Sequence, residues 1–103
     1  MRNYFRIQNE PHTLKQMQRF NSGDGGDGQT RGLCVTASVA DLMHNTAFCN
    51  LSDHAVIVVL TGEKVADIYD GLRIRPTAIV AQFTYCEFLA KVADESIYDY
   101  ETW

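Results

Sequence analysis

Residues 53–70 have the sequence DHAVIVVLTGEKVADIYD, and this stretch decides the fold. The run from Val56 to Val59 places β-branched side chains on both faces of an extended chain, which is typical of a central strand. The polar segment Thr61–Lys64 contains a glycine and indicates a turn. Residues 65–70 then predict a returning strand, so the whole stretch indicates an antiparallel hairpin.

The chain after this hairpin predicts more sheet and then a helix. Leu72–Arg75 alternates apolar with basic residues, as an edge strand does, and Pro76 stops or bulges that strand. A further β-rich run covers residues 78–83. Thr84–Glu87 fits the capping box that opens a helix, and the apolar residues that follow share one helical face.

The chain before the hairpin predicts a strand, two helices and one irregular loop. Tyr4–Gln8 alternates apolar with polar residues, and a second capping box at Thr13–Gln16 predicts a helix over 13–20. Residues 21–28 contain four glycines and two aspartates. This composition excludes regular structure, because glycine loses much backbone entropy there. Apolar residues at helical spacing then predict an amphipathic helix within 31–44.

Together these elements predict an α+β fold with a helix packed on a small antiparallel β-meander. The length of 103 residues predicts one domain, residues 1–103. Within it we expect an N-terminal strand and helix (1–20), a glycine and aspartate loop (21–31), an α-β-β-β-α core (32–94) and an acidic aromatic tail (95–103).

Composition and charge argue against several classes of protein. The net charge is −4 and the basic residues form no long run, so we expect no nucleic-acid partner. The longest apolar run, Ala55–Leu60, is far shorter than the roughly 20 residues that cross a bilayer, so we expect no membrane partner. Met1–Arg6 is not followed by the apolar stretch of a secretion signal.

The cysteine count predicts a reducing compartment. The chain has three cysteines, and an odd number without a secretion signal favours free thiols. We therefore expect the protein in the cytoplasm of the cell that makes it, or of a target cell if it is delivered as an effector. The oligomeric state stays open.

Four residues could carry nucleophilic chemistry. Cys34 stands at the expected start of a helix, where unpaired backbone amides stabilise a thiolate. His54 opens the next strand and could accept the thiol proton. Asp70, on the returning strand, could orient the imidazole. The side-chain amide of Gln29 could help to bind an oxyanion.

The choice of Asp70 depends on the length of the hairpin loop. With a three-residue loop at 61–63, paired residue numbers sum to 124, and His54 lies opposite Asp70 about 5 Å away at Cβ. A two-residue loop would turn Asp70 to the other face of the sheet. Asp67 would then share the face of His54 but lie too far along the strand to reach it.

The order of these residues resembles the core of the papain-like superfamily. The resemblance covers residues 29–70. It implies that Cys34 is the nucleophile, His54 the base, Asp70 the orienting acid and Gln29 the oxyanion donor. It also implies hydrolysis or acyl transfer at an amide bond of a protein or peptide, as in a peptidase, a deamidase or an amidase.

A second hypothesis is a non-catalytic inhibitor or regulatory module, of the phage-encoded or effector type, that binds a protein target. Its contact surfaces would be the edge strand with Arg73 and Arg75 and the aromatic tail with Tyr98, Tyr100 and Trp103. These aromatic side chains could instead fold back onto a thin core.

Metal binding is the weakest hypothesis. Cys34, His44, Cys49 and His54 include zinc-binding side chains, but their spacing lacks a paired-cysteine knuckle. Cys34 and His44 would also lie about 15 Å apart at opposite ends of one helix. The glycine and aspartate loop does not match a calcium-binding EF-hand. We therefore expect no metal and no cofactor.

Overall fold

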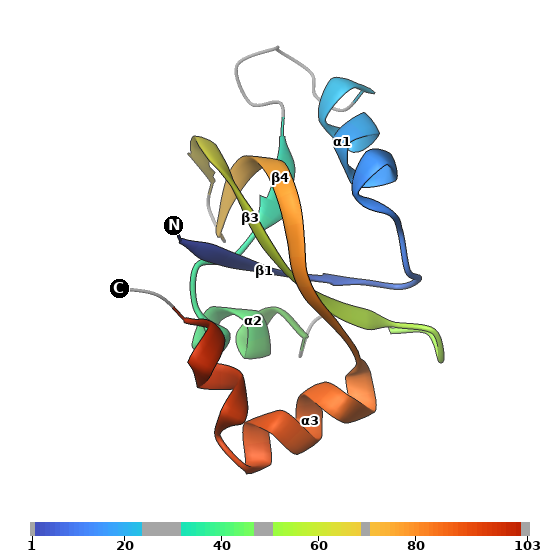
Figure 1. Cartoon of the computed structure of the whole chain (residues 1–103), viewed down its shortest axis with the longest axis vertical. Coiled ribbons are helices and arrows are strands. Elements are labelled where there is room, and N and C mark those ends of the chain that lie inside the picture. Colours follow the sequence, from blue (N-terminus) through green and yellow to red (C-terminus); the bar gives the residue numbers. More distant parts are fainter. Residues whose placement is uncertain (1, 24–31, 47–50, 69–70, 102–103) are drawn as a thin grey trace.

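The chain folds as a four-stranded antiparallel sheet with helices on both sides (Figure 1), which confirms the α+β class. The computed structural model describes residues 2–23, 32–46, 51–68 and 71–101. None of the helices in these ranges is long and apolar enough to cross a membrane. In chain order the elements are β1 (Asn3–Gln8), α1 (Leu14–Gly23), β2 (Leu33–Val35), α2 (Val39–Thr46), β3 (Val56–Ile68), β4 (Gly71–Thr84), α3 (Tyr85–Ala93) and the 3-10 helix η1 (Ser96–Tyr100).

The long hairpin of β3 and β4 forms the middle of the sheet, whose strand order is β1-β3-β4-β2. The turn predicted at 61–64 is wrong, because β3 continues through it to Ile68. Gly62 serves close packing instead. A Cβ atom at this position would lie 2.6 Å from the carbonyl oxygen of Arg75 on β4. The three short strands expected after residue 64 are therefore the end of β3 and one continuous β4.

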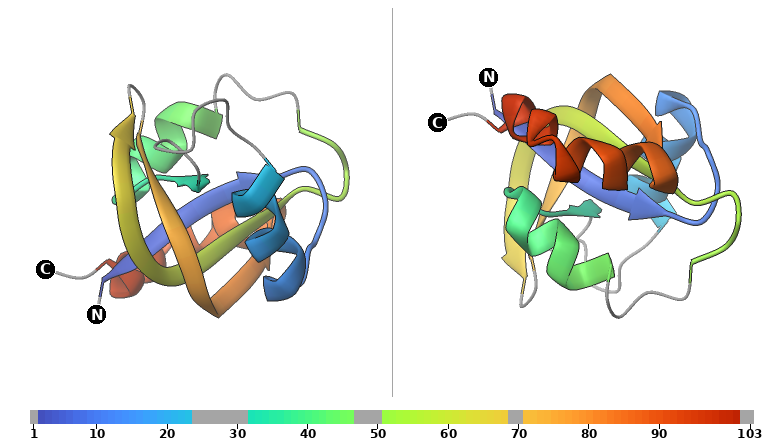
Figure 2. Two further views of the ribbon diagram at one scale, coloured as in Figure 1. Left: turned by 90° about the horizontal axis from the view of Figure 1, so that it is seen from above. Right: turned by 90° about the horizontal axis from the view of Figure 1, so that it is seen from below.

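Register shifts curl the sheet until its two edges meet. The pairing of β3 with β4 shifts at three places, and bulges of this kind increase the local twist. As a result, Phe5 on β1 bridges to Thr36 just after β2. Their backbone N–H groups donate to each other's carbonyl oxygens at 2.9 and 2.8 Å. Figure 2 shows the curled sheet from above and from below.

The sheet separates two hydrophobic clusters, and Figure 2 shows α1 on one side with α2 and α3 on the other. Residues 56–60 of β3 alternate between the two clusters, which confirms a central strand with both faces buried. The buried members of the α1-side cluster are Tyr4, Met17, Leu33, Val35, Val56, Val58, Leu60, Leu72 and Ile74. Those of the α3-side cluster are Phe5, Val39, Leu42, Ile57, Val59, Phe83, Phe88 and Ile97.

Both predicted capping boxes are confirmed. At the start of α1, the N–H of Thr13 donates to Oε1 of Gln16 at 2.8 Å, and the N–H of Gln16 donates to Oγ1 of Thr13 at 3.2 Å. Thr84 and Glu87 repeat the arrangement before α3 at 2.9 and 3.1 Å. Because α1 extends to Gly23, the first residues of the predicted irregular loop are helical. The rest of that loop lies outside the described residues.

Residues 96–101 of the acidic aromatic tail fold back onto the chain, and of the three aromatic side chains considered above Tyr100 packs against the α3-side cluster, Tyr98 is 44% exposed and Trp103 lies outside the described residues. Ile97 of η1 is buried in the α3-side cluster. Nδ2 of Asn3 donates to the carbonyl oxygen of Tyr100 at 2.9 Å. The N–H of Val39, at the start of α2, donates to Oε1 of Glu101 at 2.6 Å. The C-terminal segment therefore connects the first strand with α2.

Candidate functional site

Cys34 is the central residue of β2, at one edge of the sheet. Its neighbours Leu33 and Val35 are buried, whereas Cys34 is exposed. Arg73 on β4 is its partner across the strand pair. Directly opposed residues in an antiparallel pair share one face of the sheet, so Cys34 and Arg73 both lie on the outer face.

The helix predicted within 31–44 begins later than expected, as α2 at Val39. The chain before it stays extended because β2 pairs with β4 and because Thr36 bridges to Phe5. The placement of Cys34 at a helix N-terminus is therefore wrong. The backbone amides of α2 do not supply the stabilisation of a thiolate that the sequence predicted at this position.

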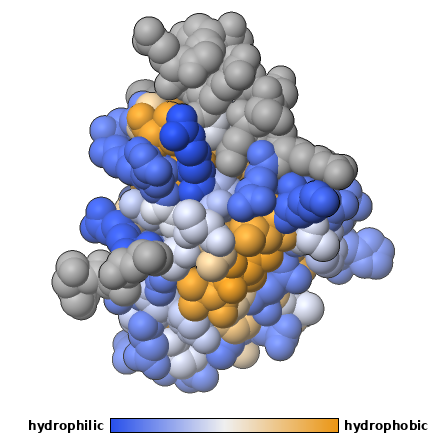
Figure 3. All heavy atoms as spheres, turned by 45° about the horizontal axis from the view of Figure 1, so that its top comes forward, coloured by the Kyte–Doolittle hydropathy of each residue, from blue (hydrophilic) through white to orange (hydrophobic). Residues whose placement is uncertain are grey.

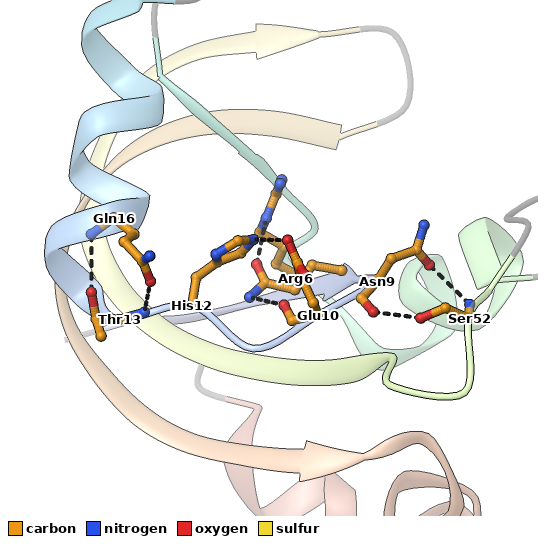
Figure 4. A network of polar contacts seen from close by, with 8 residues as sticks. Arg6, Asn9, Glu10, His12, Thr13, Gln16 and Ser52 are labelled. Atoms are coloured by element: carbon orange, nitrogen blue, oxygen red, sulfur yellow. Dashed lines mark hydrogen bonds and ion pairs between the residues drawn. The ribbon is translucent and has the colours of Figure 1, made fainter.

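His54 lies in the loop that leads into β3, two residues before the strand begins. Its side chain is exposed, and its backbone N–H donates to Oγ of Ser52 at 3.2 Å. Ser52 in turn is bound to Asn9 (Figure 4): its N–H donates to Oδ1 of Asn9, and its hydroxyl donates to the carbonyl oxygen. These bonds fasten the loop to the chain that follows β1.

The strand register separates Cys34 from His54. Cys34 pairs with Arg73, whereas Val56, just after His54, pairs with Thr84, eleven positions further along β4. Among the residues that the structure describes, no strand pairing and no hydrogen bond connects Cys34 with His54. No contact among the described residues therefore supports the predicted proton transfer from Cys34 to His54.

The predicted pairing of His54 with Asp70 is wrong as a strand register. It required a hairpin loop at 61–63, but β3 continues to Ile68 and pairs there with Gly71. Asp70 itself and Gln29 lie outside the described residues, so their proposed roles stay predictions.

Two arginine side chains reach the backbone beside Cys34. Nη1 of Arg6, on β1, donates to the carbonyl oxygen of Cys34 at 2.9 Å. Nη1 of Arg73 donates to the carbonyl oxygen of Gly32 at 3.4 Å. Gly32 has a φ of +143°, and a Cβ there would lie 3.0 Å from Cβ of Arg73, so glycine allows this close approach. On β1, Arg6 lies opposite Val58 of the α1-side cluster, so of these two arginines only Arg73 shares the face of the Cys34 thiol.

Sequence analysis did not single out Arg6 at this site. It is 28 residues from Cys34, and only the curl of the sheet brings β1 to β2. The alternating pattern of Tyr4–Gln8 predicted the strand but not what its polar side chains contact. Because the sequence does not indicate that β1 and β2 meet, it contains no signal that Arg6 lies close to Cys34.

A polar network holds the Arg6 side chain in place (Figure 4). Nε of Arg6 donates to Oε1 of Gln8 at 3.1 Å, and Nε2 of the buried Gln8 donates to the carbonyl oxygen of Glu10 at 3.1 Å. The Glu10 carboxylate lies 3.8 Å from Nε2 of His12 and forms an ion pair when that imidazole is protonated. The network directs the guanidinium of Arg6 towards β2.

A hollow of about 540 Å³ lies between α2 and the free end of the β3–β4 hairpin. Its volume is in the range of small-molecule sites. Neither Cys34 nor His54 lines it. The lining residues are Ala37, Asp41, His44, Asn45, Ile68, Gly71 and Leu72.

The predicted zinc donors belong to different elements. Cys34 is on β2 and His44 on α2, rather than at two ends of one helix, and Cys49 lies outside the described residues. Within the described ranges, no group of three or more His, Cys, Asp or Glu side chains is placed to hold a metal ion.

The second half of β4 presents an uncharged outer side. Residues 76–83 include no charged side chain. β2 pairs only with residues 72–74 of β4, and Nε2 of Gln18 on α1 donates to the carbonyl oxygen of Pro76 at 3.1 Å. Val80 is an extra residue at a register shift, and 46% of it is exposed. Figure 3 shows a band of exposed hydrophobic side chains across the middle of this view and a second, smaller group near its top.

Comparisons of the chain with protein-family models, with curated proteins and with solved structures found no match. The papain-like resemblance therefore rests on the order of four residues alone.

Proposed function

We propose that this protein is a non-catalytic module that binds another protein through the outer side of β4. The observation that carries the proposal is Val80, an exposed valine at a bulge within eight uncharged residues, 76–83. Bulges re-aim side chains and recur beside functional surfaces. Burial of such a side chain against a partner removes apolar area from water and favours association.

The chemistry of β4 indicates the kind of partner surface. Edge strands of monomeric proteins usually carry charged side chains that prevent association, and residues 76–83 carry none. Charged residues border the stretch, with Arg75 before it and Glu87 after it. We therefore expect a partner contact that is apolar at its centre and polar at its rim.

The papain-like thiol hydrolase is the second candidate. Its remaining support is the exposure of the Cys34 thiol. Cys34 lies in β2 and not at the helix N-terminus that would activate its sulfur. The register of β3 with β4 is not the one that would place His54 opposite Asp70. Binding requires neither arrangement, so we place binding first.

Site-specific photo-crosslinking tests the proposal. A photo-reactive phenylalanine analogue replaces Val80 in one variant and Leu89 in a matched control, because both side chains are 46% exposed but lie on different elements. In the cells that express the protein, we expect one discrete protein adduct from position 80 and none from position 89. The crosslinked protein is then purified, and its affinity for the unmodified chain is measured by titration.

The titration decides between the two candidates. Binding by β4 predicts that Val80→Glu weakens the affinity by about tenfold or more, that Leu89→Glu leaves it unchanged, and that Cys34→Ala leaves it unchanged. The proposal is wrong if Val80→Glu binds like the original chain. It is also wrong if the target is cleaved or deamidated by the original chain and not by Cys34→Ala.

A further inference from the structure

We propose that the partner of β4 is a second copy of this chain, which adds its own β4 antiparallel to the unpaired edge of the first. This pairing rests on the proposed function, because it uses the same surface and names its occupant. The contact combines the exposed Val80 side chains with backbone hydrogen bonds between the two strands. The resulting assembly is a dimer with two-fold symmetry.

The second half of β4 has a strand on one side only. β3 pairs with β4 as far as Thr84, whereas β2 pairs with residues 72–74. Figure 1 shows β4 continuing beyond β2 towards α3. α1 borders the start of the free edge, where Gln18 donates to the carbonyl oxygen of Pro76. The exposed residues after Pro76 are Thr77, Ala78, Val80, Gln82 and Thr84. Within the described part of the chain, residues 77–84 therefore form an edge strand.

The register shows which backbone groups point to this edge. The N–H of Tyr85 donates to the carbonyl oxygen of Ala55 at 3.2 Å, so the backbone of residue 85 faces β3. Backbone direction alternates along an antiparallel strand, and the pairing is regular over residues 81–84. The N–H and C=O groups of Gln82 and Thr84 therefore point away from β3.

The capping box of α3 agrees with this direction. The N–H of Thr84 donates to the Glu87 carboxylate at 2.9 Å and not to β3. Gln82, two residues earlier, has the same orientation, and no strand pairing of the described residues takes up its backbone groups on this side. It presents one donor and one acceptor at the open edge. An added strand pairs with main-chain groups of this kind.

The distribution of charge favours a second copy that runs antiparallel. Residues 76–83 are uncharged, so two copies of this stretch face each other without like-charge repulsion. Opposite charges border the stretch, with Arg75 before it and Glu87 in the first turn of α3. An antiparallel arrangement brings Arg75 of each copy towards Glu87 of the other, whereas a parallel one brings like charges together. Lys91 lies over the Phe83 ring, 4.7 Å from its centroid, on the side of the α3-side cluster.

Pairing of the two β4 edges limits the assembly to two copies. Each chain contributes one such edge, and the symmetric contact uses both. At the other side of the sheet, Phe5 of β1 already bridges to Thr36. A strand pair this short buries less than about 1,200 Å², which is the range of weak complexes. We therefore expect a dissociation constant of about 10–100 μM.

Sedimentation equilibrium of the purified full chain measures the association at about 1–500 μM. A thiol reductant keeps the exposed Cys34 and Cys86 from forming disulfides. We expect the average mass to rise with concentration from that of one chain towards that of two, with no larger species.

Two substitutions at position 82 test whether the contact is a strand pairing. Gln82→Pro removes the outward N–H, and an edge strand tolerates proline where the N–H faces solvent. Gln82→Ala removes the same side chain but keeps the N–H. Because the dimer carries each change twice, Gln82→Pro should associate about tenfold or more weakly than Gln82→Ala. Circular dichroism checks that both variants are folded.

A side-chain variant keeps the test decisive if Gln82→Pro does not fold. Val80→Glu places a carboxylate from each copy in the contact and should weaken the association by about tenfold or more. Leu89→Glu adds the same charge at an equally exposed residue of α3 and should leave it unchanged. A chain that stays monomeric at about 500 μM overturns the inference. Equal association of Gln82→Pro and Gln82→Ala, or of Val80→Glu and Leu89→Glu, overturns it as well.

Photo-crosslinking at position 80 separates this inference from the proposed function. An adduct that consists of two copies of the chain supports both. An adduct with a different protein, together with a monomeric purified chain, supports the proposed function and overturns the dimer. The absence of any adduct from position 80 counts against binding by β4 itself.

Discussion

The two faces of β3 are covered in different ways. On one face, a single helix, α1, contributes the buried side chain of Met17 to the α1-side cluster. On the other face, α2, α3 and η1 cover the α3-side cluster together. The bonds from Asn3 to Tyr100 and from Val39 to Glu101 connect these elements with β1 and with each other. The difference shows that one face depends on one helix and the other on several mutually braced elements.

The largest loss of stability should come from a substitution on the face that α2, α3 and η1 cover. Phe88 of α3 is fully buried in the α3-side cluster, and Phe88→Ala should lower the free energy of unfolding by about 3–5 kcal/mol. Met17→Ala should cost about 2–5 kcal/mol and fall in the lower part of that range, because methionine is flexible and its surroundings adapt to it. Urea denaturation followed by circular dichroism measures both changes.

An exposed residue on the same helix gives the control for Phe88. Leu89→Ala should change the free energy of unfolding by no more than about 0.5 kcal/mol. If Phe88→Ala does not fold, Phe88→Leu replaces it with a smaller loss of volume. A greater cost for Met17→Ala than for Phe88→Ala would contradict the comparison of the two faces.

Sequence predicted the elements whose signals are local. The run of β-branched residues in β3 places successive side chains on opposite faces, and the two capping boxes are contained within four residues each. Gly62 misled the prediction because glycine also occurs where two strands approach closely, and only the position of Arg75 distinguishes that case from a turn. The spacing of Val35 and Val39 suggested one helix, although Val35 belongs to a strand.

The site was harder to predict because its contacts are long-range. Exposure of Cys34 depends on which face of β2 the α1-side cluster occupies, and its contact with Arg6 depends on the closure of the sheet. The pairing of His54 with Asp70 depended on a loop length that a single register shift can change. Residue order alone fixes neither the face of a short strand nor its partners.

The hydrogen bond between Glu101 and the start of α2 should make a moderate contribution to stability. Glu101→Ala removes the acceptor of the Val39 N–H at the partly buried start of α2 and should cost about 1–2 kcal/mol of unfolding free energy. Glu101→Gln keeps an acceptor oxygen and should cost less. Asp99→Ala, an exposed change in η1, should have almost no effect. Equal costs for Glu101→Ala and Asp99→Ala would show that the bond does not brace α2.

The smallest expected effect is a difference in acid sensitivity between the capping boxes of α3 and α1, two helices that cover opposite faces of the sheet. The capping box of α3 uses Glu87, whose pKa is lowered from 4.5 mainly because its carboxylate accepts the backbone N–H of Thr84. The corresponding residue of α1 is Gln16, which does not titrate. A lowered pKa in the folded state contributes stability that is present above the unfolded pKa and is lost as the pH falls through the folded pKa.

We therefore expect acid to weaken the cap of α3 and to leave the cap of α1 unchanged. Glu87→Gln keeps an acceptor in the capping box without a titrating group. The denaturation midpoint of the original chain should exceed that of Glu87→Gln above pH 4.5 and approach it as the pH falls further. Asp94, whose pKa is lowered by its hydrogen bonds to Ser96, is present in both chains, so its titration cancels. A difference in midpoint that stays constant across this range would mean that the charge of Glu87 does not stabilise α3.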